Sequence, residues 1–451
     1  MEYQKFVESV FDLGQKEGFE DMEVYFQKNK EFETTVFKSE VDKFSISEVA
    51  GLSFRGLFDG KMGYAYTEIL DDQSIDMLVR EAKANAQAIE SEDKVVISSP
   101  QTGFVDVDAY YAGLNEISKA DKIDFLKKVE EEVMTLDSRI QSLAYNLYAD
   151  FEHELRIKNT KGMDLNQKNN LAVALIMALA VENGENKTGI CMVLDRDFRN
   201  FDYKKVAQKV VKEATSLLGS KTVPSKSYTV VFRNDCAASL LGAFESVFNA
   251  EVVQKDLSLM KGRLNETVAG SCVTLVDDPF MKNGFGNSSF DAEGTPTQKT
   301  EIIKDGQLLS YLHNVKTATK DNVASTGNAS KASYKSSLNV APSNMYIEPG
   351  KDGFEALISD MTEGLIIIEL QGLHSGLNTI SGDFSLAANG FLVEEGKVIR
   401  PVDQITVAGN LKDLLMDVVA VGNDLEFTFP MGSTFIASPS LKIKSLAVAG
   451  E

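Results

Sequence analysis

The three histidines are the first residues to consider for metal or acid–base chemistry. His153 stands between Glu152 and Glu154, His313 follows an apolar segment, and His374 lies in the stretch QGLHSGLN. On a strand, Glu152 and Glu154 would share one face and His153 would point to the other. No two histidines have the i, i+4 or i, i+5 spacing that is typical of a zinc-binding helix. These residues therefore favour a solvated strand face over a zinc site.

Adjacent carboxylates at Asp277 and Asp278, directly before Pro279, are a second candidate. Two neighbouring carboxylates can hold Mg²⁺, but Asp before Pro is also usual where a strand enters a turn. We favour the turn. Gly284 and Gly286, in KNGFGNSSF, look like a phosphate-binding loop only superficially, because no helix pattern follows them.

The cysteines Cys191, Cys236 and Cys272 are far apart and lie in apolar surroundings. They are expected to be buried free thiols in a reducing compartment rather than a disulfide framework. Cys236 could act as a nucleophile only with a base nearby, and its apolar neighbours indicate a core thiol. No serine has a G-x-S-x-G context with a suitable histidine.

The run Ser381-Gly382-Asp383-Phe384-Ser385 suggests peptide binding instead of catalysis. Small and polar residues before a strand can leave an open edge, to which an extended peptide adds through main-chain hydrogen bonds. A plain turn into the next strand explains the same residues equally well. Both interpretations remain open from these residues alone.

Charge and composition narrow the class of protein. The 451 residues include 46 Lys and Arg against 67 Asp and Glu, so the formal charge is 46 − 67 = −21. Direct nucleic-acid binding is not expected, because it depends on cationic side chains. The first twenty residues do not have the pattern of a signal peptide, and no apolar run approaches the roughly 18 residues of a membrane span. A cytoplasmic protein of two or three domains is expected.

The elements that must position these residues fall into an α+β pattern. An amphipathic helix, several antiparallel strands and a second helix occur in this order twice, which predicts a structural duplication. The expected elements are helix 4–18, strands 22–26, 32–39, 41–47, 51–58 and 62–67, and helix 73–90, then helix 118–135, strands 140–146, 151–159, 163–181 and 188–195, and helix 202–218. We expect domains at 1–114, 115–222 and 223–451.

The last of these domains is predicted to be β-rich. A strand at 228–232 leads into a helix that Asn234 or Asp235 can cap, and Leu240, Phe244 and Phe248 recur along it at helical spacing. Many short strands separated by X-Gly turns follow, which indicates a mostly antiparallel barrel or sandwich. Helices near 353–363 and 409–419 are expected to pack against it.

Several stretches of the chain resemble the TldD/PmbA family, on its PmbA/TldE side. The resemblance covers essentially the whole chain. It rests on GLSFRGLFDGKMGYAYT (51–67), TLVDDP (274–279), SFDAEGTPTQKT (289–300), STGNA (325–329), MYIEPG (345–350), SGDFSLAANGFLVEEGKV (381–398), VAGNLKDLL (407–415) and VGNDLEF (421–427). It implies a cytoplasmic metallopeptidase system in which a TldD subunit carries a zinc-binding HExxxH motif and a later cysteine ligand. TldD and TldE pair, degrade small or unfolded peptides and mature modified peptides; the family has also been linked to DNA gyrase inhibitors.

The chain departs from this pattern at the motif itself. The resemblance places the two histidines and the glutamate at Gly242, Val247 and Ala243, none of which can bind zinc or accept a proton. Residues 430–433 (PMGS) stand near the expected cysteine. No catalytic residue and no metal site are therefore expected here, and zinc is expected in a TldD-like partner.

The resulting hypothesis is a TldE/PmbA-like subunit that completes a peptide chamber without performing the chemistry. Two alternatives remain. The first is a chain that hydrolyses peptides itself, with a metal ion at Glu152, His153 and Glu154 or at Asp277 and Asp278. The second is a homodimer that binds peptides without cleaving them.

Overall fold

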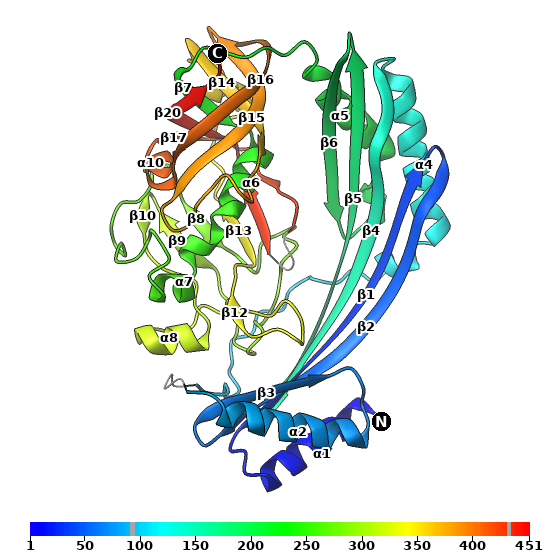
Figure 1. The fold of residues 1–451 in the computed structure, drawn as a ribbon, viewed down its shortest axis with the longest axis vertical. Coiled ribbons are helices and arrows are strands. Elements are labelled where there is room, and N and C mark those ends of the chain that lie inside the picture. Colours follow the sequence, from blue (N-terminus) through cyan, green and yellow to red (C-terminus); the bar gives the residue numbers. More distant parts are fainter. Residues whose placement is uncertain (91–94, 431–433) are drawn as a thin grey trace.

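Two helix–strand–strand–strand–helix units build the N-terminal half, as Figure 1 shows. The computed structural model describes residues 1–90, 95–430 and 434–451. The first unit comprises α1 (Tyr3–Lys16), β1 (Met22–Phe37), β2 (Glu40–Phe58), β3 (Lys61–Thr67) and α2 (Asp72–Gln87). After the short α3 (Gly113–Glu116), the second comprises α4 (Lys119–Leu136), β4 (Ile140–Asn159), β5 (Asp164–Glu182), β6 (Glu185–Asp195) and α5 (Tyr203–Ser216). The predicted duplication is confirmed.

The six strands of both units form one antiparallel sheet in the order β3-β2-β1-β4-β5-β6. The units meet where β1 pairs with β4. Three of these strands were predicted as shorter pieces: 22–26 with 32–39, 41–47 with 51–58, and 140–146 with 151–159 are each one strand. Cross-strand pairs such as Lys28–Glu48 keep the ladder continuous where breaks were predicted.

The helices and the C-terminal half cover opposite faces of this sheet. Val24, Phe54 and Phe32 belong to the cores under the helices. Tyr25, one residue from Val24, packs instead against Phe290 and other residues of the C-terminal half. This alternation is what a strand with two buried faces requires.

The C-terminal half is organised around a closed five-stranded barrel. Its strands are β7 (Lys226–Phe232), β14 (Glu363–Gln371), β15 (Asp383–Glu394), β16 (Lys397–Asn410) and β20 (Leu441–Ala449), and pairing of β16 with β20 closes it. Only the β7–β14 pair is parallel among these five. The prediction of a barrel or sandwich is thus resolved as a barrel, which β17 (Val418–Val421) extends at β20.

A second C-terminal sheet packs beside the barrel. Its order is β10 (Gln307–Leu308), β9 (Thr300–Lys304), β8 (Leu275–Asp277), β13 (Asn344–Ile347), β19 (Phe435–Ser438) and β18 (Glu426–Phe427). A small pair, β11 (Ala329–Ser330) and β12 (Asn339–Val340), and α8 (Val315–Asp321) lie below it. The helices predicted at 353–363 and 409–419 are shorter, α9 (Phe354–Ile358) and α10 (Leu411–Met416), because β14 and β17 begin within those ranges.

The helix predicted after β7 is broken. It consists of α6 (Asn234–Ala243), a 3-10 turn (Glu245–Phe248) and α7 (Ala250–Gln254). Asn249 stops the turn and caps α7 by accepting the Glu251 N–H at 2.8 Å. Neither Asn234 nor Asp235 occupies the cap of α6, since Arg233 does, without a side-chain bond. The apolar spacing continued across the break, so periodicity alone could not reveal it.

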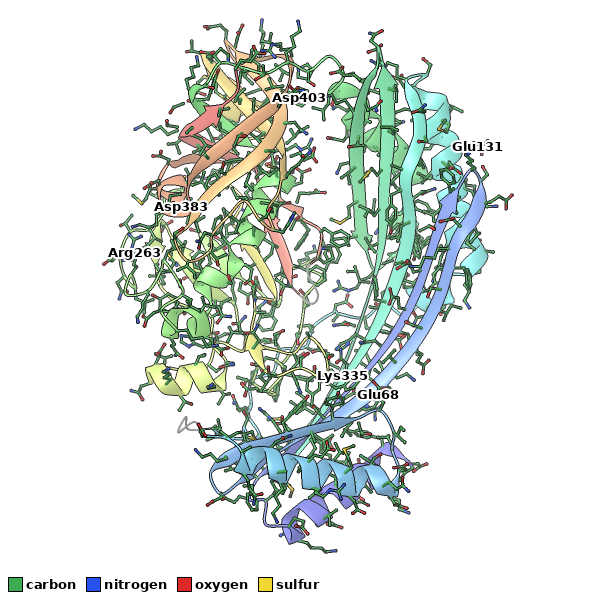
Figure 2. All side chains as sticks on the ribbon, viewed as in Figure 1. Glu68, Glu131, Arg263, Lys335, Asp383 and Asp403 are labelled. Atoms are coloured by element: carbon green, nitrogen blue, oxygen red, sulfur yellow. The ribbon has the colours of Figure 1, made fainter. Side chains whose placement is uncertain are left out.

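Buried polar contacts join the two halves at one end of the sheet. Arg55 of β2 donates to Glu23 at 2.7 Å and to Glu293 of the C-terminal half at 3.5 Å. Gly51 makes room for Tyr334, whose ring a β-carbon there would meet at 2.2 Å. Lys335 pairs with Glu68 at 2.6 Å beside β3, where Figure 2 labels both residues. Beyond this joint, the upper part of the sheet in Figure 1 faces the barrel.

Candidate functional site

A cleft of about 270 Å³ lies where that upper part of the sheet faces α6 and the barrel. Its wall comes from β6 and α5 on one side and from β14, α6 and β18 on the other. Lys187 of β6 pairs with Asp403 of β16 near one end. Near the other end Arg196 donates to the carbonyls of Gly284 and Phe285, at 2.9 and 3.0 Å. Segments far apart in sequence thus build one hollow.

Strand β6 gives this cleft an open sheet edge. It is the last strand of the N-terminal sheet and pairs only with β5 among the described strands. Gly189 lets α5 cover one face of β6 closely, because a β-carbon there would lie 2.2 Å from the Ala214 nitrogen. Ile190 lies on the opposite face of β6, lines the cleft and is exposed. The edge therefore offers main-chain donors and acceptors to an added strand.

An apolar patch on the same sheet continues the wall of the cleft. It faces away from the helices and consists of Leu147, Ala149, Val173, Leu175, Met192 and Leu194. Leu175 and Met192 reach into the cleft itself. Such a wall accepts apolar side chains without requiring a particular one.

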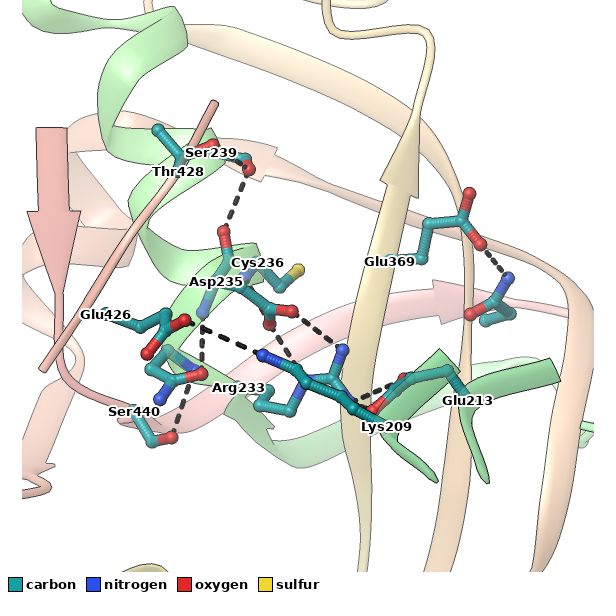
Figure 3. Close-up of polar contacts among 12 residues, drawn as sticks. Lys209, Glu213, Arg233, Asp235, Cys236, Ser239, Glu369, Glu426, Thr428 and Ser440 are labelled. Carbon is teal, nitrogen blue, oxygen red and sulfur yellow. Dashed lines mark hydrogen bonds and ion pairs between the residues drawn. The ribbon is translucent and has the colours of Figure 1, made fainter. Parts of the chain in front are cut away.

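Arg233 anchors the polar side of the cleft at the start of α6 (Figure 3). Its guanidinium donates to both Glu213 oxygens at 2.9 Å and to Asp235 at 2.7 and 2.8 Å. Burial alone would lower the pKa of Arg233, but the two carboxylates outweigh it and raise that pKa. Nearby, Lys209 pairs with Glu426 at 3.6 Å, and Ser239 bonds Thr428 at 2.8 Å. These groups hold the walls together.

The Cys236 thiol also lines the cleft, but it is unsuited to nucleophilic chemistry. Burial, and then the charge of Asp235, raise its pKa well above the ordinary value. A thiol becomes reactive as a thiolate, which this setting disfavours. Cys236 and Cys191 are buried free thiols as predicted, whereas Cys272 is exposed. The prediction was wrong for Cys272, which precedes β8 in a surface loop.

The carboxyl end of α6 holds the three positions at which the resemblance places a zinc motif. Ala243 lies seven residues after Cys236, so both fall on the same side of the helix. A β-carbon on Gly242 would meet Ile436 at 3.6 Å, and Val247 is fully buried. None of the three offers a zinc donor or a base. Across the described residues, no three His, Cys, Asp or Glu side chains cluster to hold a metal ion.

Zinc therefore does not fit this end of α6. Met431, Gly432 and Ser433, near which a cysteine ligand was expected, lie outside the described residues. Their side chains include no thiol.

Glu245, just beyond α6, is a titratable residue that the sequence did not single out. Burial and the charge of Asp277 raise its pKa to about 7. Asp277 accepts hydrogen bonds from Asn328 at 2.6 Å and from the Ser343 N–H and hydroxyl at 2.8 and 2.9 Å. Burial still raises the pKa of Asp277 to about 6. The apolar residues around Glu245 in sequence were the only available signal of its burial.

Comparison with family models identifies the chain. It matches PmbA/TldA metallopeptidase domain 1 over residues 22–86, the central domain over 113–218 and the C-terminal domain over 225–450. This chain belongs to the PmbA/TldD family. The resemblance inferred from the sequence is thereby confirmed.

Relatives within the PmbA/TldD family match along most of their lengths. A Thermotoga maritima structure described as a modulator of a DNA gyrase is 31% identical with a TM-score of 0.91, covering 99% of this chain and 100% of that one. TldE from Thermococcus kodakarensis is 21% identical with a TM-score of 0.90 over 99% and 100% of the two chains, which shows a shared fold. Metalloprotease PmbA of Escherichia coli is 26% identical over 75% of this chain and 72% of its own.

The Glu152-His153-Glu154 segment of this PmbA/TldD-family chain lies within β4, its side chains engaged by neighbours. Glu152 pairs with Lys30 at 3.2 Å, and Glu154 with Arg156 at 2.5 Å. His153 Nδ1 lies 2.6 Å from the side-chain oxygen of the cross-strand Asn29. Burial lowers the pKa of His153 to about 4. The three side chains form cross-strand and ion-pair contacts instead of converging.

The other predicted candidates are dispersed. Asp278 accepts the Phe280 N–H at 2.9 Å, a turn contact that separates it from Asp277. The Gly284–Gly286 loop binds Arg196 and Asn344, so its polar backbone serves the fold. His313 is buried against Thr317 and Thr326, and His374 is exposed in the loop after β14. The structure brings none of them together.

Residues 381–385 do not form the open strand edge that motivated the peptide-binding prediction. Phe384 pairs with Gly409 on one side and bridges to Leu377 on the other, and the Ser385 N–H donates to the Gly376 carbonyl at 2.7 Å. The loop at Gly376 and Leu377 therefore pairs with this strand edge. Figure 2 shows Asp383 on the side of the C-terminal half remote from the N-terminal sheet, with Asp403 nearer to it. Peptide contact by residues 381–385 stays a prediction.

Proposed function

We propose that this chain is the zinc-free, TldE/PmbA-like subunit of a peptidase complex and that a TldD-like partner supplies the zinc and the catalytic residues. The observation that carries the proposal is the pairing of a well-formed cleft with an α6 end made of Gly242, Ala243 and Val247. A zinc peptidase needs three protein ligands and a base near an open position. The cleft wall beside this end of α6 is suited to binding a substrate, but not to cleaving it.

The substrate is an extended peptide, held along β6 in the cleft. Main-chain hydrogen bonds to the β6 edge would bind peptides of many sequences, and Leu175 and Met192 would receive apolar side chains. We propose peptide binding at β6, and peptide contact by residues 381–385 stays a separate prediction. The role is processing of small or unfolded peptides and peptide maturation.

The proposed location is the cytoplasm, without nucleic acid or membrane as a partner. The charge of −21 opposes contact with a phosphate backbone. Within the described residues, no helix has the length and apolar character needed to cross a bilayer.

Substitution of Ile190 tests the cleft in the reconstituted complex. Ile190→Lys places a charge at the β6 edge and should raise KM for an apolar peptide about tenfold, while kcat changes less, because only binding is impaired. Ile399→Lys is the matched control, since Ile399 is an equally exposed strand residue of β16 outside the cleft. Equal kinetics of both variants would contradict peptide binding at β6.

Reconstitution also separates the alternatives. Zinc-dependent hydrolysis by the purified chain alone would favour an autonomous metallopeptidase. Peptide binding that never leads to hydrolysis, with or without a TldD-like partner, would favour the non-catalytic binding dimer.

A further inference from the structure

Negative charges outnumber positive charges among the side chains that line the cleft. The charged lining residues are Lys209, Arg233, Glu213, Asp235, Glu369 and Glu426. Two cations thus face four carboxylates, which leaves an excess of two negative charges. A hollow lined with an excess of one sign concentrates the field inside it. A cationic group should therefore be attracted into this cleft.

Glu369 of β14 is the carboxylate of this wall that has no cationic partner. Both cations of the wall form ion pairs with its other carboxylates. Within the described part of the chain, the hydrogen-bond donors to Glu369 are two neutral amides, Asn389 at 2.5 Å and Gln371 at 3.2 Å. Neutral donors fix the orientation of a carboxylate but leave its charge in place.

Asn389 adds an unused acceptor beside Glu369. Its side-chain nitrogen donates to Glu369, whereas its side-chain oxygen is buried and accepts no hydrogen bond from any residue that the structure describes. A buried acceptor without a donor is costly, and most such atoms in proteins have a partner. The Glu369–Asn389 pair therefore has acceptors in excess of donors, as a site for a cation requires.

Glu369 acts inside the cleft and not on its rim. Burial and the charge of Asp235 are the main causes of the raised pKa of the Cys236 thiol, and the charge of Glu369 adds to them. Figure 3 shows Glu369 on its own strand, apart from the ion pairs that Arg233 forms with Glu213 and Asp235. Its charge is therefore available to a bound molecule that reaches Cys236.

We propose that the cleft selects peptides that carry a cationic group, and that Glu369 binds this group. The inference rests on the proposed peptide-binding role of the cleft and defines its substrate class further. A carboxylate that Asn389 and Gln371 hold in place can accept charge-assisted hydrogen bonds from a lysine or arginine side chain or from a free amino terminus. The apolar residues Leu175 and Met192 would contact other side chains of the same peptide.

Peptide binding to the purified full chain tests the proposal by fluorescence anisotropy. Three labelled peptides share one length and a sequence of leucine, valine and serine residues. The first has blocked ends and a central lysine, the second has blocked ends and norleucine in place of the lysine, and the third has the norleucine and a free amino terminus. At least one of the two cationic peptides should bind about tenfold tighter than the blocked neutral one. Which of them does so identifies the source of the cation.

A matched pair of variants assigns the preference to Glu369. Glu369→Gln keeps the size of the side chain and removes its charge, so the preference for a cationic peptide should fall below about twofold, with the affinity for the neutral peptide unchanged. Glu363→Gln is the control, because Glu363 is an exposed glutamate at the start of the same strand and does not line the cleft. It should keep the full preference.

A salt titration of the wild-type chain tests the same point without a substitution. Raising the salt concentration from about 50 to about 500 mM should reduce the preference, because it screens the attraction between the charges. The affinity for the neutral peptide should change little.

Three results would overturn the proposal: equal affinity for cationic and neutral peptides, a preference that does not respond to salt, and a preference that both variants reduce alike. The last would assign the effect to the overall charge of −21. In each case binding of the neutral peptide would leave the proposed function standing. A chain that binds none of the three peptides would contradict the proposed function, and this inference with it.

Discussion

At its amino end α6 faces the cleft with Arg233, Asp235 and Ser239, whereas its carboxyl end carries Gly242 and Ala243 and stops against Ile436. At the amino end, Arg233 donates to Glu213 of α5 and pairs with Asp235. Ser239 bonds Thr428, which directly follows β18. The carboxyl end has no side chain that could take part in catalysis. The difference teaches that the helix positions a cleft wall at one end and offers neither a zinc ligand nor a base at the other.

Substitution of Arg233 should remove the polar contacts at the amino end of α6 and destabilise the protein. Arg233→Met leaves Glu213 and Asp235 half-buried without their partner, so it should destabilise the protein by about 3 kcal/mol. Urea denaturation gives the value. Arg263→Met is the control, because Arg263 pairs with the exposed Glu266 at the surface, and should change stability by less than about 1 kcal/mol. Similar losses for both would mean that the Arg233 contacts carry no special weight.

Glu245, just beyond the carboxyl end of α6, should make the stability of the protein depend on pH. Its pKa is about 7 in the folded chain against 4.5 ordinarily. Between these values the folded state keeps a proton that the unfolded state releases, so stability falls as pH rises from 4.5 to 7. Glu245→Gln removes this loss and should be more stable than the wild type by about 2 kcal/mol at pH 8, with no gain near pH 4.5.

Denaturation midpoints at both pH values measure the effect. Glu355→Gln, at an exposed glutamate of α9, is the control and should show no pH-dependent gain. A gain of Glu245→Gln that is the same at pH 4.5 and pH 8 would contradict the assigned titration.

Alanine substitutions at Gly242 and Gly189 should give the smallest changes in stability. Gly242 has room for a β-carbon, so Gly242→Ala should stabilise the protein by about 0.5–1 kcal/mol through helix propensity. Gly189→Ala meets the α5 backbone and should destabilise it. Thermal unfolding of both variants decides. A loss of stability in Gly242→Ala would show that close packing, and not the absence of a catalytic side chain, explains this glycine.

Much of the fold could be predicted from local patterns. The helix and strand periods of residues 4–218 indicated the duplication, and X-Gly turns of the kind predicted for the last domain occur at Asp305-Gly306 and Glu395-Gly396, with positive φ at all four residues. The break after Ala243 was missed because Phe244, Val247 and Phe248 maintain helical spacing, although Asn249 caps a new helix. The continuity of β1 and β2 was missed because polar residues in a sheet that is covered on both faces resemble loop residues.

The site was less accessible to sequence reasoning. The absence of ligands at Gly242, Ala243 and Val247 followed from the resemblance. The cleft could not be predicted, because it joins β6 with β14 and β18, which are more than 160 residues away along the chain. The expected edge at Ser381–Ser385 was wrong because a loop that is close in sequence, at Gly376 and Leu377, pairs with it. Which edges stay open depends on strand lengths and on remote covering segments.

The most direct test measures zinc content and peptide hydrolysis by the purified chain, alone and together with a TldD-like subunit. The account predicts substoichiometric zinc and no hydrolysis for the chain alone after incubation with excess zinc. It predicts hydrolysis that chelation abolishes once the partner is added. One zinc per chain with chelator-sensitive hydrolysis in the absence of a partner would contradict the account.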